Sequence, residues 1–396
     1  MLSWEQTPSI TSLRRSRAWI EIDLSALAHN VRQLKSLLSP GCDLMAVVKA
    51  DAYGHGAITV AQTVLNAGAT WLGVATIPEG IELREAGISA PILVLGASYS
   101  PEQIRSMARW QLEPTLCTSQ QALVFAETLA QSPGEVSIDD PVPVHIKLDT
   151  GMTRLGVPWQ EAGSFVRLVR GLPNLEIASI YSHLATADSP DQTIMREQHD
   201  RFERAIREIA TPFGAMPRLH FANSAATLTD KTLHYDIVRV GLAIYGLYPA
   251  PHLQKEIALE PAMQIKARIT QVKAIAPGTG VSYGHKFIAS QPMRVAVVGI
   301  GYADGVPRSL SNRMKVVVRG ELVPQIGAIT MDQLMLDVTA VPEVKPGEVV
   351  TLLGREGRYC LSADDWAASC GTISWEILCG FKHRLPRMAV GVLQPL

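Results

Sequence analysis

The amino-acid sequence predicts an α/β protein in which an N-terminal (β/α)8 TIM barrel is followed by a mostly antiparallel β-strand C-terminal domain. The first observation is length, because 396 residues exceed the ~100–200 residues of one ordinary domain. The second is a series of eight short apolar segments that alternate with amphipathic stretches between residues 43 and 246. The third is a change of pattern near Pro261, after which strand-like segments are joined by short turns.

Eight segments of the first part have the character of buried parallel strands. They are residues 43–50, 71–76, 91–96, 112–118, 142–149, 176–183, 218–224 and 236–246. Helices are expected between them, for example over residues 55–67, 101–110, 119–131 and 192–209. Pro78 and Pro101 suit first turns, and Ser119 suits an N-cap. Apolar strands that alternate with helices are typical of parallel β–α units. A doubly wound open sheet competes, and the count of eight favours the barrel.

The second part predicts a β domain. Its strand-like segments are residues 263–275, 293–302, 314–323, 333–341 and 348–354, separated by turn clusters. Residues 361–370 are the one segment expected to be helical there. The expected organisation is therefore a flexible arm over residues 1–17, a barrel over 18–257 and a β domain over 258–396.

Composition excludes several classes of function. The formal net charge of −1 offers no field to attract nucleic acid or an anionic membrane surface. The chain has no apolar run of the ~18 residues needed to span a membrane. Five cysteines without a C-x-x-C pair argue against a disulfide framework or a zinc knuckle. The first 17 residues lack the apolar stretch of a secretory signal, so we expect a cytoplasmic protein.

Lys49 directly follows the apolar run Met45-Ala46-Val47-Val48 at the end of the first expected strand. The carboxyl ends of barrel strands meet at the mouth where barrel enzymes keep their active sites. Burial there lowers the pKa of an ammonium group, which is how a lysine becomes a nucleophile or a base. The alternative is a lysine that extends from the strand end into solvent.

Further polar residues interrupt the later strands. His145, Lys147 and Asp149 share one face of the fifth strand because side chains alternate with a period of two. That face points either into the barrel, where Arg154 could be a partner, or toward a polar edge of the helix layer. Arg239 lies in the apolar eighth strand and needs an acceptor, which is either a structural carboxylate or a ligand.

Strands six and seven also end on polar residues. Strand six ends on His183, with Asp188 a little beyond, and strand seven ends on Asn223 and Ser224. Each of them alone is ordinary loop chemistry. Jointly they place polar groups at one rim of the predicted barrel.

Nine strings of the sequence resemble, in the same order, the motifs of alanine racemases, which bind pyridoxal 5′-phosphate (PLP). They are AVVKADAYGHG (46–56), HIKLDTGMTRLG (145–156), YSHLATAD (181–188), ANSAA (222–226), VRVGLAIYG (238–246), VSYGHKF (281–287), GYADGVPR (301–308), MDQLMLDV (331–338) and HRLPR (383–387). The match spans about residues 18–390, and nine strings in order are highly specific. The family is a homodimer of a barrel and a β domain, in agreement with the fold expected above.

The resemblance implies a role for each matching residue. Lys49 would hold PLP covalently, Arg239 would face its pyridine nitrogen, and Arg154 would contact its phenolic oxygen and the substrate carboxylate. Lys147 would support Arg154, and in many family members this lysine is carbamylated. The remaining expected cofactor contacts are Tyr53, His183, Asn223, Ser224, Gly241 and Leu242, and the other supporting positions are Tyr302, Asp332 and Trp375.

The implied reaction is the interconversion of L-alanine and D-alanine by two bases, which supplies D-alanine for peptidoglycan. Lys49 would serve one face of the substrate, and Tyr283 of the second subunit the other. The backbone of Met331, also from the second subunit, would reach the substrate carboxylate. Arginine at the pyridine nitrogen cannot hand over a proton, which favours a racemase over a decarboxylase of the same barrel type.

Three positions depart from the family pattern. Trp375 stands where a tyrosine is usual near the phosphate, Ala328 replaces a common arginine, and Thr330 replaces a common cysteine. An indole keeps one N–H donor but lacks the hydroxyl. Two alternatives therefore stay open, which are a racemase of broader or serine-preferring scope and a PLP-binding protein without turnover. The presence of the β domain argues against the second alternative.

Overall fold

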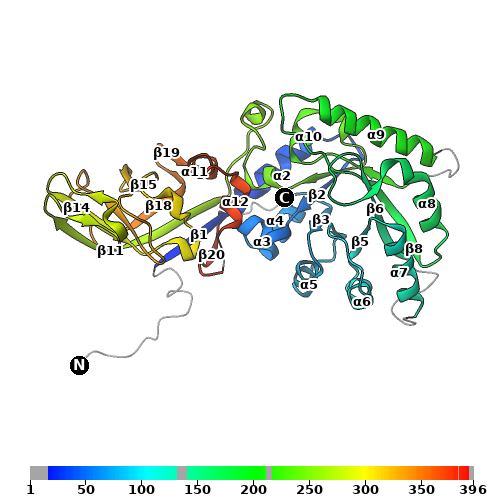
Figure 1. Cartoon of the computed structure of the whole chain (residues 1–396), viewed down its shortest axis with the longest axis horizontal. Helices are drawn as coiled ribbons and strands as arrows, with labels where there is room; N and C mark the ends of the chain where they lie inside the picture. Colours follow the sequence, from blue (N-terminus) through cyan, green and yellow to red (C-terminus); the bar gives the residue numbers. More distant parts are fainter. Residues whose placement is uncertain (1–16, 132–140, 211–215, 382, 392–396) are drawn as a thin grey trace.

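The computed structural model describes residues 17–131, 141–210, 216–381 and 383–391. A barrel of parallel strands with helices around it forms one part of the molecule, and a largely antiparallel sheet forms the other (Figure 1). The expected arm over residues 1–17 lies almost wholly outside the described residues.

Eight strands form the barrel and confirm the predicted count. They are β2 (Asp43–Val47), β3 (Trp71–Val74), β4 (Ile92–Val94), β5 (Glu113–Leu116), β6 (Val142–Asp149), β8 (Leu175–Tyr181), β9 (Arg218–His220) and β10 (Ile237–Val240). The order β10-β2-β3-β4-β5-β6-β8-β9 follows the chain around a ring, which excludes the doubly wound sheet. Backbone bonds of 3.0 Å from Asp236 N–H to Leu219 O and from Arg239 N–H to Ala222 O join the two ends.

The last barrel strand is shorter than expected. It ends at Val240, and residues 242–245 form the 3-10 helix η3 (Leu242–Tyr245) instead of continuing the strand to 246. The short extra strand β7 (Val157–Pro158) pairs with β6.

Helices surround the barrel, and the four example helices are confirmed to within two residues at each end. The helices are α2 (Leu24–Leu37), α4 (Ala57–Asn66), α5 (Ile77–Glu85), α6 (Pro101–Arg109), α7 (Ser119–Ala130), α8 (Ala162–Arg170), α9 (Thr193–Ala210) and α10 (Ser224–Thr229). Pro78 and Pro101 lie in first turns as predicted. The prediction for Ser119 is wrong by one residue, because Thr118 is the N-cap and accepts the Gln121 N–H at 3.1 Å.

The second sheet is built on the long strand β11 (Met263–Ile275), which pairs antiparallel with β1, β14 and β18. Its other members are β1 (Ala18–Asp23), β14 (Met293–Val298), β15 (Lys315–Val318), β16 (Glu321–Pro324), β17 (Leu334–Asp337), β18 (Val349–Glu356), β19 (Tyr359–Leu361) and β20 (Arg387–Val390). The sequence did not predict β1 or β20, which pair in parallel with each other. β1 lies in the range expected for the barrel but belongs to this second sheet.

The β domain contains more helix than expected. α11 (Ala363–Cys370) confirms the predicted helix, and α12 (Ser374–Cys379) is a second one that the sequence reading missed. α12 packs against α3 (Lys49–Gly54), the turn that follows the first barrel strand. The helix therefore brings Trp375 to the barrel mouth.

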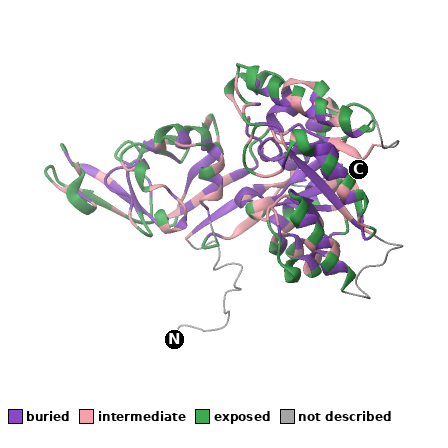
Figure 2. Cartoon of the chain, turned by 45° about the vertical axis from the view of Figure 1, so that its right-hand side comes forward, coloured by how far each residue is buried: buried purple, intermediate pink, exposed green. Residues whose placement is uncertain are grey.

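One apolar core runs through both parts, from the barrel strands along β1 and β11 (Figure 2). The outer faces of the barrel helices are exposed, whereas the strands are buried. No helix among the described residues is long and apolar enough to cross a membrane.

Candidate active site

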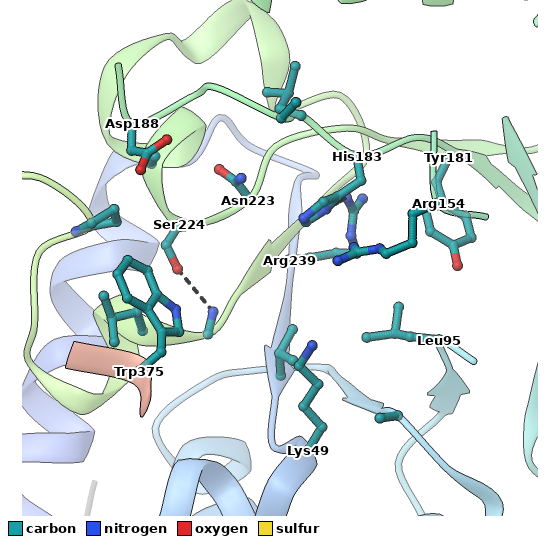
Figure 3. A pocket seen from close by; sticks show the side chains of 18 of the residues that line it. Lys49, Leu95, Arg154, Tyr181, His183, Asp188, Asn223, Ser224, Arg239 and Trp375 are labelled. Atoms are coloured by element: carbon teal, nitrogen blue, oxygen red, sulfur yellow. Dashed lines mark hydrogen bonds between the residues drawn. The ribbon is translucent and has the colours of Figure 1, made fainter. Parts of the chain in front are cut away.

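A cavity of about 430 Å³ opens at the carboxyl ends of the barrel strands (Figure 3). Eleven of the residues predicted from the sequence line it: Lys49, Tyr53, Lys147, Arg154, His183, Asn223, Ser224, Arg239, Gly241, Leu242 and Trp375. Four of its lining side chains are lysines or arginines, and Asp188 is the one carboxylate among its described lining residues. The arrangement suits a ligand that carries several negative charges.

Lys49 is presented to this cavity by an uncommon backbone turn. Ala50, Asp51, Ala52 and Tyr53 all have φ of +52° to +53°, so α3 is left-handed over these residues. For L-residues this conformation costs ~1–2 kcal/mol each. The turn is held by a bond of 2.8 Å from Ala52 N–H to the Val48 carbonyl. Lys49 and Tyr53, at its two ends, both line the cavity.

Burial and the charge of Arg154 lower the pKa of Lys49. The sign favours the neutral amine, because desolvation penalises the ammonium form. The lysine is therefore suited to accept a proton or to attack a carbonyl carbon. The alternative of a solvent-directed lysine does not agree with its place in the cavity.

Tyr53, Ser224 and Gly241 form a small cradle in the same cavity as Lys49. The Gly241 N–H donates a hydrogen bond of 3.0 Å to Ser224 Oγ (Figure 3). A Cβ at residue 241 would lie 2.6 Å from Tyr53 Oη, so a side chain there would displace the tyrosine. Asn223 caps α10 by accepting the Ala226 N–H at 3.1 Å. The hydroxyl groups of Tyr53 and Ser224 both face this cavity, and the bond from Gly241 leaves the Ser224 hydroxyl proton available to donate to an anion.

Arg239 is 4% exposed and lies in the middle of β10. It donates to His220 Nδ1 at 3.0 Å and to His183 Nδ1 at 3.2 Å, and to the Ser182 carbonyl at 2.6 Å. These acceptors are imidazole rings and a backbone carbonyl. The structural carboxylate that was one of the two expected acceptors for Arg239 is therefore not among them. Burial lowers the pKa of Arg239 to about 10, which leaves the side chain charged at neutral pH. Burial and Arg239 hold the pKa of His183 well below its usual range, so this ring is neutral.

The polar face of β6 points into the barrel. His145 is 0% exposed and Lys147 is 5% exposed. The partner of His145 is Glu113 at 2.6 Å, and not Arg154, which is exposed at the cavity rim. Burial, Arg239 and Arg154 lower the pKa of Lys147 to about 8. Among the described residues no carboxylate forms an ion pair with Lys147.

The remaining predicted residues lie on the β domain, away from the barrel mouth of the same chain. Tyr283, Tyr302 and Met331 are 72%, 42% and 53% exposed. Asp332 accepts a hydrogen bond of 2.7 Å from Arg384. The structure of one chain therefore does not bring Tyr283 to Lys49.

Two residues of this region were missed by the sequence reading. His220 ends β9 and contacts Arg239, and its signal in the sequence was that of a polar residue inside the expected strand 218–224. Glu79 accepts hydrogen bonds at the left-handed turn, and its signal was only that of an acid in the first turn of a helix.

A desolvated lysine and a buried arginine lie at the carboxyl ends of the barrel strands, where barrel enzymes have their active sites. The fold and the site therefore define a (β/α)8-barrel enzyme with a cation-rich active site. Sequence models of the alanine racemase N-terminal and C-terminal domains match residues 22–249 and 262–389. The chain belongs to the alanine racemase family.

Individual relatives agree with this assignment. An alanine racemase of Nostoc is 67% identical over 94% of this chain and 96% of the relative, and one of Synechocystis is 58% identical over 95% and 100%. Among solved structures, the alanine racemase of Clostridium difficile has a TM-score of 0.89 at 33% identity, covering 95% of this chain and 96% of its own. The alanine racemase of Bacillus anthracis with bound L-Ala-P has a TM-score of 0.87 at 36% identity, covering 94% and 95%.

Proposed function

We propose that this chain is a PLP-dependent racemase that interconverts L-alanine and D-alanine. The observation that carries the proposal is Lys49, whose pKa is lowered by burial in a cavity that it shares with Arg154 and Arg239. Family membership supports the choice of reaction. The proposed role is supply of D-alanine for peptidoglycan in the cytoplasm.

The residues at the mouth fit PLP. Lys49 would hold the cofactor, the cradle of Tyr53, Ser224 and Gly241 would take its phosphate, and Arg239 would face its ring nitrogen. The absence of a side chain at residue 241 lets the Tyr53 hydroxyl approach the backbone closely at the cavity. When bound, PLP would supply the electron sink for the charge left on the substrate by loss of its α-proton.

The protein side of the reaction consists of proton movements and charge. Lys49 Nζ would take or return the α-proton on one face of alanine, for which its lowered pKa is suited. Tyr283 Oη would do so on the other face. Arg154, at the cavity rim, would bind the substrate carboxylate. Arg239 keeps its charge throughout because a guanidinium does not release its proton near neutral pH.

We propose a homodimer in which Tyr283 and Met331 of one copy complete the site of the other. Three large side chains of the β domain, Tyr283, Tyr302 and Met331, are exposed together with Ile288 at 59%. In the proposed dimer the second copy covers these side chains. The separation of Tyr283 from Lys49 within one chain agrees with this arrangement.

We also propose that Lys147 is carbamylated. A pKa of about 8 leaves a substantial fraction of neutral amine, which is the form that reacts with CO₂. The carbamate would place a negative charge between Arg154 and Arg239, the two cations that lower the pKa of Lys147. Mass spectrometry under native conditions would detect the added group, and Lys147→Ala should remove it.

Racemisation of a panel of L-amino acids, followed by chiral chromatography with PLP present, tests the proposed function. Alanine should react fastest, and borohydride reduction should fix the cofactor to Lys49. Because Trp375 lines the cavity, Trp375→Tyr tests the alternative of broader scope. Faster turnover of serine than of alanine would favour that alternative, and cofactor binding without any turnover would favour a PLP-binding protein.

Mixing two inactive variants tests the shared site. Lys49→Ala and Tyr283→Ala should each be inactive, but a mixed dimer contains one site with both native residues. After subunit exchange, about a quarter of wild-type activity should return, because half of the dimers are mixed and each has one intact site of two. Mixed dimers without activity would contradict the shared arrangement.

A further inference from the structure

One line of hydrogen bonds crosses the interior of the barrel from its amino end to the cavity. Glu113 Oε2 lies 2.6 Å from His145 Nε2, and His145 Nδ1 lies 2.6 Å from Ser179 Oγ. Ser179 Oγ lies 2.6 Å from His220 Nε2, and His220 Nδ1 lies 3.0 Å from Arg239 Nη1. We call these five residues the interior line. It passes through β5, β6, β8, β9 and β10 and ends on a guanidinium at the cavity (Figure 3).

The interior line is closed to water along most of its length. Its three middle residues are fully buried and Arg239 is 4% exposed, whereas the Glu113 side chain is 12% exposed. The Tyr181 ring stacks on His220 with a centroid distance of 4.5 Å. In such surroundings a polar atom without a hydrogen-bond partner is costly, so the donors and acceptors along the line must match.

One assignment of protons satisfies the whole line with neutral histidines. Arg239 can only donate, so His220 Nδ1 accepts and His220 carries its proton on Nε2. That proton goes to Ser179 Oγ, whose own hydroxyl proton then goes to His145 Nδ1. His145 therefore carries its proton on Nε2 and donates it to the Glu113 carboxylate. Burial and Arg239 hold the pKa of His220 well below its usual range, in agreement with a neutral ring.

The two ends of the interior line carry opposite charges, and each of its hydrogen bonds points from the arginine to the carboxylate. No described carboxylate contacts Arg239 directly, and Lys147 and Arg154 add further positive charge near it. A charged group buried without compensation is strongly unfavourable. Aligned hydrogen bonds polarise one another, so a carboxylate at the far end can stabilise the guanidinium. The interior line does not conduct protons to the cavity, because Arg239 does not release a proton near neutral pH.

We propose that Glu113 is a positioning residue of the active site, which acts through His145, Ser179 and His220 as the counter-ion that holds Arg239 charged and oriented toward the cavity. The effect on turnover rests on the proposed function, in which Arg239 faces the cofactor ring. The proton arrangement of the line does not rest on it.

Nitrogen-15 NMR of histidine-labelled holoenzyme tests the arrangement directly. His145 and His220 should each show a protonated Nε2 and an unprotonated Nδ1. Glu113→Gln keeps the shape and an acceptor oxygen but removes the charge. It should shift the Nε2 signal of His145 and also that of His220, which does not touch Glu113. In a Ser179→Ala background the same change should no longer shift His220. A doubly protonated His145, or a His220 signal that ignores Glu113→Gln, would overturn the proposal.

Kinetics give the second measurement. Glu113→Gln should lower kcat for alanine about tenfold, the size of one lost charge-assisted hydrogen bond, with KM changed by less than about twofold. Ser179→Ala should have a similar effect, and the double variant no more than either, because both break one line. Glu176→Gln is the matched control, since this exposed glutamate lies near the start of β8, a strand of the same barrel that is separated from β5 by β6. Additive losses would overturn the proposal. If alanine is not racemised but the NMR pattern holds, the proposed function fails and the interior line stands.

Discussion

The Glu79 carboxylate accepts the Ala50 N–H at 2.7 Å, directly after Lys49, and so braces the left-handed turn. Its other oxygen accepts the Ala75 N–H at 2.7 Å and the Thr76 N–H at 3.1 Å. One carboxylate therefore ties the end of β2 to the end of β3. A strained backbone persists where the surrounding contacts over-determine it, and Glu79 is such a contact at the reactive lysine.

Replacing Glu79 by glutamine tests this brace. The amide would turn an N–H₂ group toward a backbone N–H, so one donor would lose its acceptor. We expect a loss of ~1–3 kcal/mol in the free energy of unfolding and weaker retention of PLP. Denaturant unfolding and dialysis of the holoenzyme measure the two effects. Glu82→Gln, on the exposed side of the same helix, should change stability by less than ~0.5 kcal/mol.

Gly241→Ala should weaken PLP binding by displacing Tyr53. The φ of Gly241 is −112°, so the effect is steric and not a matter of backbone strain. The new methyl group would lie 2.6 Å from Tyr53 Oη and 3.2 Å from its Cζ. Adding Tyr53→Phe removes the closer contact, so thermal stability should partly recover while PLP affinity stays low. Full PLP affinity in Gly241→Ala alone would contradict the cradle.

Asp304→Asn should destabilise the β domain. Asp304 is 1% exposed and accepts two bonds from Arg17, at 2.8 and 2.6 Å, and one from Gly301 N–H at 3.0 Å. The Arg17 side chain is 34% exposed and asparagine keeps one acceptor oxygen, so we expect a loss of ~1–3 kcal/mol in the free energy of unfolding. The neighbouring Ala303 N–H binds the Met331 carbonyl at 3.0 Å, so activity should also fall. Unfolding of the β domain and turnover are the measurements, with the exposed Glu343→Gln as the neutral control.

His55 should make the protein sensitive to acid. Complete burial lowers its pKa to about 4, against 6.5 for an exposed histidine. Below pH 6.5 the His55 ring therefore binds a proton in the unfolded chain, whereas in the folded chain it stays neutral until about pH 4. The free energy of unfolding is therefore highest above pH 6.5 and falls as the pH drops toward 4. His55→Phe, which can keep the ring contact of 4.4 Å with Tyr245, should reduce the loss between pH 7 and pH 5 by about 2 kcal/mol. An unchanged loss would mean that other groups, such as His183 and His220, cause it.

The sequence was informative wherever a residue contradicted its local pattern. Lys49 at an apolar strand end, Arg239 inside an apolar strand and Lys147 on the polar face of β6 all line the cavity at the barrel mouth, and His145 on the same face is buried inside the barrel. Buried polar groups are rare and have to be compensated, so their presence in a predicted strand carries information. The prediction for Ser119 failed because Thr118 and Ser119 are both good caps, and only backbone geometry selects one.

Partners across the barrel could not be predicted in this way. Glu113 opens a short strand, and nothing in its local sequence connects it to His145 or to Arg239. β1 and β20 come from opposite ends of the chain and pair with each other, a contact that no period or motif announces. Such contacts depend on how strands close into a ring or meet in a sheet.

The sequence by itself determined the barrel followed by a β domain and the polar residues at the strand ends, because periodicity and local polarity are properties of neighbours along the chain. The remaining expected cavity residues, Tyr53, Gly241, Leu242 and Trp375, came from the resemblance to a family. Only the tertiary structure decided how these residues are charged and oriented. Burial depresses the pKa of Lys49, Lys147 and His183, and a line of hydrogen bonds through five strands gives Arg239 its distant carboxylate. Desolvation and hydrogen-bond direction are set by what surrounds a group in space, and the linear sequence does not contain that information.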